Sequence, residues 1–517
     1  MSSLYFLLFV TLISQGSNAF KMVLFVPDLA NSQLPLRKDR WSEATKCAFL
    51  SVLFNARVAE TLAKAGHDVT MVMISIHKVN ASSGIKKDDF EERQKIFIFE
   101  DLSIWDSRLR ERIGQTMSLI TDTCRTFSHK RNSVVLENKE FLNWLLLQEF
   151  DIAFTHVLDV CPIGLVHYAK IPSWIWLNSG GLMDYVAHYM GVPTLPSYVP
   201  PMLMESSDKM DFFERVKSFV GHTLIIAFWK RMVVDPETDL FRKLIDPNFP
   251  DIVDIVKECP LVMVNSNELY EAPRPTLSKT VNIGGVAMES KEATPLPAMP
   301  APWKKTFLDA FKSFPEHHFI MKYEGTDLQD QLPPNVYVFK WLPQTALLAH
   351  PKTKVFISHG GYNSLQEAII AGVPLVTIAL FGDQPKNAKL AEKHRIAVNL
   401  RKGNLTVSTI VNALQKLFSD QSYTQNIKRL SSMVKKRPVK AEHLLVAWAE
   451  FVAEFKTLEN LVPAGNNLNF FQYHSIDVIA FLFAVLISII FIVYKFLLFI
   501  VTKLYLLIFH ARKEKKA

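Results

Sequence analysis

The sequence predicts an α/β protein made of two doubly wound domains, followed by one membrane-spanning helix. Three observations support this prediction. Short apolar strands alternate with helical segments over two long stretches, which is the pattern of parallel sheets covered by helices on both faces. A proline-rich stretch separates these two parts of the chain. A dense apolar run then follows the second part.

Length and composition limit the class of protein. A chain of 517 residues has room for two or more domains with full-sized cores. Because 49% of the residues are hydrophobic and 21% are charged, the chain is not of the disordered class. The net charge is +8, but Arg512, Lys513, Lys515 and Lys516 account for much of it. A basic tail at a membrane explains this better than nucleic-acid binding, which we do not expect.

Both ends of the chain carry signals of a secretory membrane protein. Residues 1–19 are expected to be a signal peptide, because the apolar run Leu4–Ile13 is followed by small residues at the cleavage positions. The uninterrupted apolar run Val478–Tyr494 predicts a transmembrane helix over residues 476–500, and a buried core helix is the weaker alternative. Residues 501–517 are then a basic cytoplasmic tail.

The C-terminal residues also indicate a location. Lys513 and Lys515 fit the K-x-K-x-x form of a dilysine retrieval signal. Together with the signal peptide and the single span, this predicts a single-pass type I protein of the endoplasmic reticulum membrane with its body in the lumen. Asn80 and Asn404 stand in N-x-S/T sequons and are the expected glycosylation sites on that side.

The domain boundaries follow the change in composition. We predict an N-terminal domain at residues 20–285, a linker at 286–302 and a C-terminal domain at 303–470. The predicted strands of the first domain are Lys21–Val26, Val69–Ser75, Asp151–Phe154, Ser173–Leu177 and Leu261–Asn265. Those of the second are His318–Lys322, Val336–Phe339, Lys354–Ser358, Leu375–Ala379 and Ala397–Leu400.

One connection in the first domain is far longer than usual. The first helix is expected at Asn55–Ala65, whereas strand-to-helix loops usually span about 2–6 residues. The intervening segment Leu34–Ser51 has no clear period. We interpret most of this segment as an insertion, either a functional lid or sequence encoded by an unremoved intron.

The stretch from Trp341 to Gln384 carries the clearest functional signal. Lys354–Ser358 is an apolar strand, His359-Gly360-Gly361 a tight turn and Asn363–Ala371 a helix. Such a turn presents free backbone N–H groups at the positive end of a helix dipole, where a phosphate or diphosphate binds. Each of these features, taken alone, more often belongs to an ordinary turn or to the core than to a binding site.

The combination of W-x-P-Q, H-G-G-x-N-S-x-x-E, A-G-V-P and D-Q in this stretch is more specific. It resembles the signature of the UDP-glycosyltransferases, a membrane-anchored family that moves a sugar from a UDP-sugar to a small lipophilic acceptor. The resemblance implies the GT-B architecture, in which an N-terminal acceptor-binding and a C-terminal UDP-sugar-binding Rossmann-like domain face a cleft. It implies UDP-glucose or UDP-glucuronate as co-substrate, with no cofactor and no metal.

The resemblance also assigns roles to residues of the nucleotide site. Trp341 and Gln344 are expected to face the uracil and the ribose, and Glu367 to accept from a ribose hydroxyl. His359 and Ser364 are expected to serve the phosphates, together with the two glycines of the turn.

Three further residues complete the expected donor site. Asn363 is expected near the phosphates, and Asp383 and Gln384 are expected to hold the sugar. A strand end followed by these two polar residues facing a cleft has no packing rationale, so the structural alternative is weakest for this pair.

The expected catalytic base is altered. The family places a catalytic His after the first strand, where this chain has Gln33, which cannot take a proton at neutral pH. The position of the Asp that steadies that His is occupied here by His156. With Asp159 nearby, His156 is an alternative base, although a lone His at such a position is more often a structural hydrogen-bonder.

A second departure concerns the second domain. The family has a strand ending in a Ser-containing turn between the Gly-Gly linker and the first helix of this domain. In this chain, the segment between Gly285 and Trp303 is rich in proline and contains no run of residues that favours a β-strand. Without that strand, the sheet is expected to have a gap or to re-pair.

These observations favour an inverting UDP-glycosyltransferase that conjugates glucose or glucuronic acid to small lipophilic hydroxyl compounds. The alternative is a membrane-anchored UDP-sugar-binding protein with impaired catalysis; a structural adhesion protein has no support in the motifs. The sequence leaves open whether the protein forms a homo-oligomer. Its four cysteines lack metal-ligand spacing, so isolated thiols or at most one or two disulfides are expected.

Overall fold

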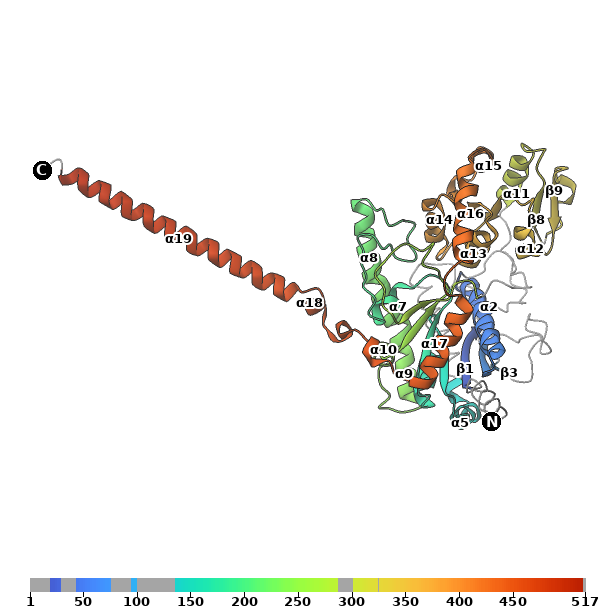
Figure 1. The fold of residues 1–517 in the computed structure, drawn as a ribbon, viewed down its shortest axis with the longest axis horizontal. Helices are drawn as coiled ribbons and strands as arrows, with labels where there is room; N and C mark the ends of the chain where they lie inside the picture. Colours follow the sequence, from blue (N-terminus) through green and yellow to red (C-terminus); the bar gives the residue numbers. More distant parts are fainter. Residues whose placement is uncertain are drawn as a thin grey trace, which may run out of the picture. The chain divides into compact units, whose positions relative to one another are not determined.

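The computed structural model describes residues 19–28, 43–75, 94–99, 135–286, 301–323 and 325–514. The chain separates into two compact units, Met1–Val462 and Pro463–Ala517 (Figure 1). The predicted signal peptide up to residue 18, Gln33 and the sequon at Asn80 lie outside the described residues.

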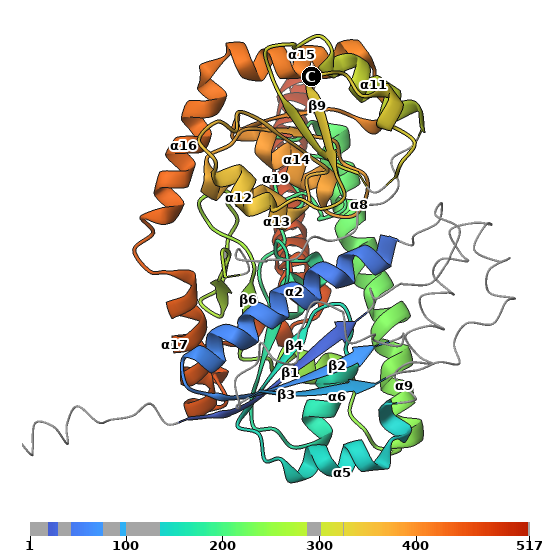
Figure 2. The same cartoon turned by 90° about the vertical axis from the view of Figure 1, so that its right-hand side faces the viewer.

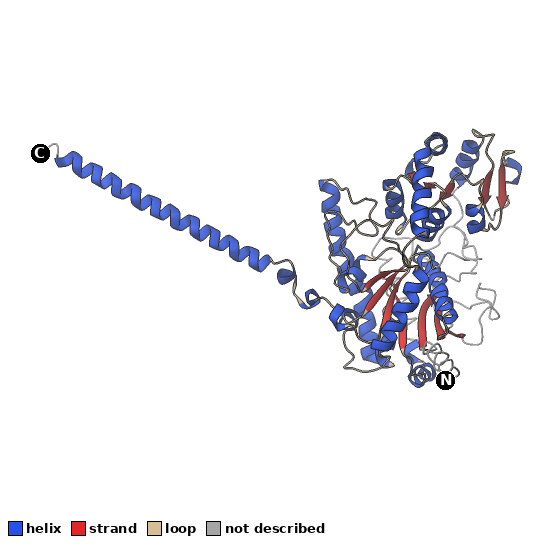
Figure 3. Ribbon diagram, in the orientation of Figure 1, coloured by secondary structure: helices blue, strands red, loops and turns tan. Residues whose placement is uncertain are grey.

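The N-terminal half of the first unit is built on a seven-stranded parallel sheet, drawn in red in Figure 3. The strands are β1 (Lys21–Asp28), β2 (Asp68–Ser75), β3 (Gln94–Phe99), β4 (Ile152–His156), β5 (Trp174–Asn178), β6 (Leu261–Val264) and β7 (Thr280–Asn282). Their order is β3-β2-β1-β4-β5-β6-β7, so the winding reverses between β1 and β4. The five predicted strands are confirmed, whereas β3 and β7 were not predicted. In such sheets ligands bind beyond the carboxyl ends of the strands, near the reversal.

Helices cover both faces of this sheet. They are α2 (Glu43–Lys64), α5 (Lys139–Leu147), α6 (Cys161–Tyr168), α7 (Asp184–Tyr189), α8 (Phe212–Trp229), α9 (Asp235–Leu244) and α10 (Ile252–Lys257). A short π-helical segment, Lys230–Val234, joins α8 to α9. Strands β4 and β5 are buried along their whole length, as expected for central strands between two helical layers.

Helix α2 corrects one sequence expectation. It begins at Glu43, well before the predicted start at Asn55, so the last part of Leu34–Ser51 continues the helix. The earlier part of that segment lies outside the described residues. The helix is fixed by apolar side chains of its C-terminal turns, among them Phe54 and Leu62, which pack on the sheet beside Met22.

The C-terminal half carries the remaining strands and a second set of helices. The strands are β8 (Phe319–Lys322), β9 (Val336–Phe339), β10 (Phe356–Ser358), β11 (Leu375–Thr377) and β12 (Ala397–Asn399). The helices are α11 (Ala301–Phe311), α12 (Gln344–Ala349), α13 (Tyr362–Ala371), α14 (Gln384–Lys393), α15 (Val407–Ser419), α16 (Gln421–Lys435) and α17 (Ala441–Phe455). All five predicted strands are confirmed.

Among the described residues, the strands of this half form two parallel sheets; most of the segment in which the sequence predicts a missing strand, residues 287–300, lies outside the described residues. One sheet is β8-β9 and the other β10-β11-β12. Within the described residues no strand joins β8 to β10. Helices α11 and α15 hold the two sheets over one core, in which Phe311 and Leu414 pack with Val376. On β8, Ile320 is 51% exposed, far more than a central strand position would be.

Helix α17 returns to the N-terminal half and completes its core. Leu445, Ala449 and Val452 are buried against the sheet face that also packs on α2. Figure 2 shows α17 and α2 near each other on this side of the sheet, and the two helices are in contact. The last helix of the first unit therefore ties the C-terminal half to the N-terminal half.

The second unit contains α18 (Phe470–Tyr473) and α19 (Ile476–Glu514). Its segment Ile476–Leu504 is long and apolar enough to cross a membrane, with a mean hydropathy of 3.0 in its most apolar window and no part of that window buried. At 1.5 Å per residue its 29 residues measure about 44 Å, more than a hydrocarbon core of roughly 30 Å. The helix continues through most of the predicted tail, as far as Glu514.

Candidate functional site

The turn between β10 and α13 has the geometry of an anion site. Ser358 Oγ accepts from the N–H of Gly360 at 3.2 Å, and Gly360 has a φ of +80°, which a residue with a side chain rarely adopts. A Cβ on Gly361 would lie 2.6 Å from the His359 ring. The positive φ favours glycine at position 360, and a side chain at position 361 would require the His359 ring to move.

Helix α13 begins at this turn without a side-chain cap on its first N–H groups. These groups and the helix dipole create positive potential at the turn, which favours a phosphate. At the other end Gly372, with a φ of +74°, stops the helix. The structure places His359, Gly360 and Gly361 together at the start of α13, as predicted.

Three of the predicted ribose and phosphate residues form one hydrogen-bonded cluster. Gln344, the first residue of α12, donates from Nε2 to Glu367 Oε2 at 2.7 Å and to Ser364 Oγ at 3.4 Å. Burial raises the pKa of the Glu367 carboxyl, and hydrogen bonds from Gln344 and Thr345 oppose that rise. Glu367 lies in the second turn of α13, so its carboxyl group stands near the predicted phosphate position.

Trp341 precedes this cluster and remains 51% exposed. A tryptophan that served only the core would be far more buried. Its indole is therefore accessible for stacking by a flat base, and Gln344 lies three residues further along the chain.

Asp383 and Gln384 follow β11 at the same end of the sheet. Asp383 Oδ2 accepts from Asn387 Nδ2 at 2.8 Å, and Asn387 Nδ2 also donates to Gly360 O at 3.1 Å. Asn387 thus joins the predicted sugar-binding carboxylate to the predicted phosphate turn. Burial raises the pKa of the Asp383 carboxyl, and the hydrogen bond from Asn387 opposes that rise. Sequence reasoning missed Asn387, although its position four residues after Asp383 on a helix could have pointed to it.

Gln384 has a structural role, although the sequence argument considered that alternative weakest for the pair Asp383 and Gln384. Its Oε1 accepts from the N–H groups of Leu380 and Phe381 at 2.9 and 3.2 Å, and its side chain is buried. The expectation that this residue has no structural function is therefore wrong. The carboxamide closes the loop that carries Asp383.

Polar contacts join the two halves of the first unit at the carboxyl ends of their strands. Asn265, which follows β6, donates from Nδ2 to Asn363 Oδ1 and to Ser179 O, both at 3.0 Å. Gln366 Nε2 donates to Asn265 Oδ1 at 3.2 Å. Asn363, which was predicted to lie near the phosphates, thus also accepts a hydrogen bond from the N-terminal half of the first unit. Sequence reasoning missed Asn265 and Gln366.

The loop after β5 lies opposite Asp383. Asn178 Nδ2 donates to the carbonyls of Gly180 and Gly181 at 2.8 and 2.9 Å and shapes this loop. A Cβ on Gly180 would lie 3.9 Å from Asp383 Oδ2. The predicted sugar-binding carboxylate therefore faces a loop of the half in which the acceptor is expected.

The predicted catalytic residues of the N-terminal half lie in a different setting. His156 ends β4 and is 1% exposed; its Nδ1 accepts from the Leu158 N–H at 3.1 Å. Asp159 is also buried, and its Oδ1 accepts from the Cys161 N–H at 3.0 Å. These contacts favour a structural role for both side chains, and the catalytic role of His156 stays a prediction. Cys161 and Cys259 are buried.

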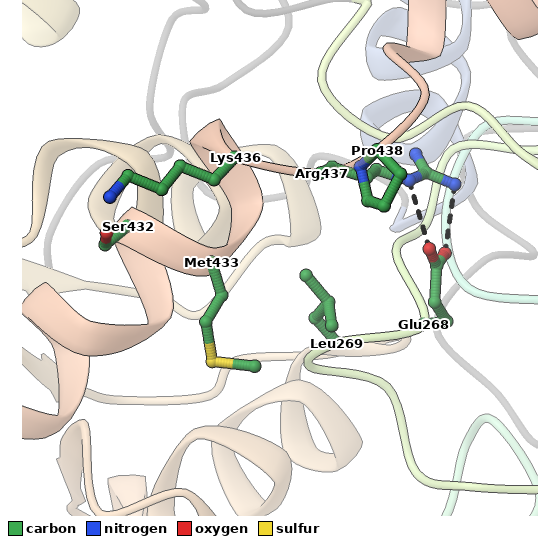
Figure 4. Close-up of a pocket in the computed structure, with 7 residues that line it drawn as sticks. All are labelled: Glu268, Leu269, Ser432, Met433, Lys436, Arg437 and Pro438. Carbon is green, nitrogen blue, oxygen red and sulfur yellow. Dashed lines mark hydrogen bonds and ion pairs between the residues drawn. The ribbon is translucent and has the colours of Figure 1, made fainter.

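A separate pocket of about 350 Å³ lies where α16 approaches the loop after β6 (Figure 4). At its edge Arg437 Nε lies 3.0 Å from Glu268 Oε1, and Arg437 Nη2 donates to Glu268 Oε2 and to Asn282 O, each at 3.1 Å. None of the residues that line this pocket belongs to the predicted donor site. The ion pair ties the end of α16 to the N-terminal half. Among the described residues, no group of His, Cys, Asp and Glu side chains is arranged to hold a metal ion.

Solved structures with a similar overall fold are GT-B glycosyltransferases. UGT2 of Phytolacca americana, solved with UDP-2-fluoro-glucose and pterostilbene, aligns with a TM-score of 0.55 over 84% of this chain and all of its own, at 13% identity. The calicheamicin glycosyltransferase CalG4 aligns with a TM-score of 0.54 over 86% of this chain and all of its own, at 17% identity. The fold is therefore of the GT-B class.

Sequence comparison identifies the particular family. The family of UDP-glucuronosyl and UDP-glucosyl transferases matches residues 49–305 and 298–509, and the chain belongs to it. Human UDP-glucuronosyltransferase 1A9 is 30% identical over 84% of this chain and 86% of its own. Mouse UDP-glucuronosyltransferase 1A9 is 31% identical over 71% of this chain and 72% of its own. The Caenorhabditis elegans protein ugt-50 is 27% identical over 90% of this chain and 92% of its own. The protein is thus a member of a family of hexosyltransferases that use UDP-sugars and small-molecule acceptors.

Proposed function

We propose that this protein transfers glucose or glucuronic acid from a UDP-sugar to a hydroxyl of a small lipophilic acceptor, with inversion at the anomeric carbon. The observation that carries the proposal is the cluster of Gln344, Ser364 and Glu367 beside the uncapped start of α13. A carboxylate for the ribose and backbone N–H groups for the diphosphate stand together there, next to the exposed face of Trp341.

In the proposed reaction, the acceptor oxygen forms a bond to the anomeric carbon while the bond from that carbon to the diphosphate oxygen breaks. The electron pair of the breaking bond stays on the diphosphate, and UDP leaves. The start of α13 stabilises the charge that develops on the leaving group. Asp383 is placed to hold sugar hydroxyls between the turn and the loop at Gly180.

The acceptor hydroxyl must also lose its proton during the attack. Gln33 cannot take that proton at neutral pH, and His156 is the alternative base in the sequence. A base elsewhere in the acceptor half, or an acceptor that ionises readily, would serve the same step. Acidic phenols are therefore the first acceptors to test.

A second candidate function is UDP-sugar binding without transfer. The division of the C-terminal sheet into β8-β9 and β10-β11-β12 favours it, because a strand that would brace the donor site does not join them within the described residues. Gln33 in place of a basic residue points the same way.

The two candidates are separated by measuring binding and transfer on the same preparation of the full chain. UDP affinity is measured by calorimetry, and conjugates of a phenol panel with UDP-glucose and UDP-glucuronate are sought by mass spectrometry across a range of pH. A conjugate supports the transferase, and UDP binding without a conjugate at any pH supports the binding protein. If UDP does not bind, both proposals are wrong.

The variant Gln33→His refines this test. If only the base is missing, the variant forms conjugate at a rate above that of the natural chain while its UDP affinity is unchanged. Gln33→Asn is the matched control, since it alters the same position without adding a titratable group.

We further propose that the body of the protein lies in the lumen of the endoplasmic reticulum. The apolar helix α19 and the exposed sequon at Asn404 support this location. We expect the chain to lose mass when it is treated with an endoglycosidase. The variant Asn404→Gln should lack the part of this loss that comes from a glycan at position 404. A chain that never gains mass at either sequon would contradict a lumenal body.

A further inference from the structure

A short loop of the N-terminal half contacts the C-terminal half beside the predicted sugar site. It consists of residues 202–208, between α7 and α8, and we call it the strap. Glu205 Oε1 accepts from Arg401 Nε at 3.2 Å, and Asp208 Oδ2 accepts from Lys393 Nζ at 2.7 Å. Figures 1 and 2 show α8, which follows the strap, near α14 of the C-terminal half. The strap thus presents two carboxylates to two cations of the other half.

The strap is fixed in its own half at both ends. The N–H of Met202 donates to Asp184 Oδ2 at 2.9 Å, and Asp184 is buried at the start of α7. Ser206 is buried as well, and its Oγ donates to Glu214 Oε1 at 3.3 Å in the first turn of α8. Because these contacts hold the strap, its two carboxylates carry the position of the N-terminal half to their partners.

Those partners belong to the elements that hold the loop between β11 and α14. This loop, residues 378–383, carries the predicted sugar-binding carboxylate, and we call it the sugar loop. Lys393 is the last residue of α14, the helix that begins directly after the sugar loop. Arg401 is followed by Lys402, whose Nζ donates to Leu380 O at 2.7 Å. Both ion pairs of the strap therefore end on elements next to the sugar loop.

Asn399 connects the strap to the start of the sugar loop by two longer contacts. Its Nδ2 donates to Glu205 Oε1 at 3.5 Å, and its Oδ1 accepts from Thr377 Oγ1 at 3.4 Å. Thr377 is the last residue of β11 and directly precedes the sugar loop. Glu205 thus contacts two residues, Asn399 and Arg401, that lie on the path to this loop.

A general contribution to stability explains this arrangement poorly. Isolated ion pairs at a protein surface often contribute little to folding. Here the side chains of Glu205 and Asp208 are only 32% and 22% exposed, and the two pairs come from one short loop. Both pairs also converge on the support of a single loop of the other half. This convergence indicates that the strap serves to place the sugar loop.

We propose that the strap positions the donor sugar. The ion pairs of Glu205 and Asp208 hold the sugar loop in the place where the carboxylate of Asp383 meets the hydroxyls of the hexose. Glu205 is thus a positioning residue, since it acts through Arg401 and the sugar loop. The inference rests on the proposed binding of a UDP-sugar and adds that the N-terminal half sets the geometry of the sugar site. Since UDP has no sugar, its affinity does not depend on the strap.

The experiment compares two affinities of the full chain. Calorimetry measures the affinity for UDP, UDP-glucose and UDP-glucuronate, and the ratio of UDP-sugar to UDP affinity is taken for the sugar that binds more tightly. The double variant Glu205→Gln and Asp208→Asn removes both charges and keeps the size of the side chains. We expect the ratio to fall at least about fivefold, while the affinity for UDP stays within about twofold.

Exchange of the two charges of one pair distinguishes positioning from damage to the fold. Glu205→Arg alone and Arg401→Glu alone should each lower the ratio, because each brings like charges together. The two changes combined re-form the attraction and should restore the ratio to within about twofold of the natural value. The matched control is Asp254→Asn, which breaks an exposed pair with Lys257 on α10 and should leave the ratio unchanged.

Salt gives a second readout that a misfolded variant would not reproduce. Salt at about 1 M should lower the ratio more in the natural chain than in the double variant, since exposed charges are then largely screened. An unchanged ratio in the double variant would overturn the inference, as would charge exchange that restores nothing. An equal loss of affinity for UDP and the UDP-sugar would also overturn it. A chain that binds no UDP would instead refute the proposed function, on which the inference rests.

Discussion

At the scale of single residues, the donor site combines positions that the sequence identifies with others that it hides. Gln344, Ser364 and Glu367 were predicted and do form one cluster. Asn265 was not predicted, because its partner Asn363 lies 98 residues away in the chain, and the contact of Asn387 with Gly360 likewise spans 27 residues, although its contact with Asp383 is local. Local patterns carry no information about such contacts, which arise only when the strands are aligned.

Glu367 should make donor binding depend on pH. Burial raises the pKa of its carboxyl above the ordinary value, and ribose hydroxyls would donate to its ionised form. UDP affinity is therefore full above that raised pKa and falls as the pH drops through it. Calorimetry with UDP between about pH 5 and pH 8 should show this decline in the natural protein.

The variant Glu367→Gln should bind UDP about tenfold more weakly at neutral pH and lose most of this pH dependence. Glu392→Gln, on the exposed side of α14, is the control and should retain both affinity and pH profile. An unchanged pH profile in Glu367→Gln would exclude the proposed ribose contact.

Trp341 should contribute to nucleotide affinity and little to folding. Because its indole is half-exposed, Trp341→Ala should change the melting temperature little. Loss of base stacking should make the free energy of UDP binding less favourable by about 1–3 kcal/mol. Affinity for pyrophosphate, which has no base, should be unchanged; an equal loss for both ligands would show that the variant disturbs the phosphate turn instead.

At the scale of elements, strand periodicity predicted β8 to β12, the strands of the donor half within the described residues, because each is a short apolar run bounded by turn residues. Sequence reasoning placed the start of α2 twelve residues too late, at Asn55 instead of Glu43. Residues at the N-terminal end of α2 have no regular apolar period, so tertiary context sets that boundary.

Within the described residues no further strand pairs with β8 or β10, and this leads to a testable prediction at the scale of elements. If residues 287–300 are replaced by a segment of equal length that contains an apolar strand and a Ser turn, the new strand should pair with the edges of both β8 and β10. We expect a rise in melting temperature of at least about 5 °C, where 1 kcal/mol corresponds to roughly 2–4 °C, together with tighter UDP binding.

The matched control is a Gly/Ser segment of the same length, which cannot form a stable strand. If the proteins that carry the two replacement segments have the same melting temperature, the edges of β8 and β10 do not pair with an added strand. The gap would then be a stable feature of this fold.

At the scale of the whole molecule, the first unit is held together by α17 and by polar contacts near the strand ends. The fold class and the long apolar C-terminal helix could be predicted from periodicity and apolar length alone. The contacts between the two halves could not, because they join residues far apart in the chain: Asn265 and Asn363 are separated by 98 positions, and Glu268 and Arg437 by 169.

The ion pair between Arg437 and Glu268 should couple the two halves. Arg437→Met should lower the melting temperature by about 2–4 °C, since a partly exposed two-point pair contributes up to about 1 kcal/mol. Differential scanning calorimetry measures the change. Arg395→Met, which breaks the more exposed pair with Asp420, is the control and should have a smaller effect. Equal effects would mean that Arg437 does not join the halves.

The most direct test of the central claim is the anomeric configuration of the product. The full chain is incubated with UDP-α-glucose or UDP-α-glucuronate and a phenolic acceptor, and the conjugate is examined by proton NMR. An inverting transferase gives the β-anomer, and Glu367→Gln should give far less of it at a subsaturating donor concentration. An α-anomer, or release of free sugar without any conjugate, would contradict the proposed reaction.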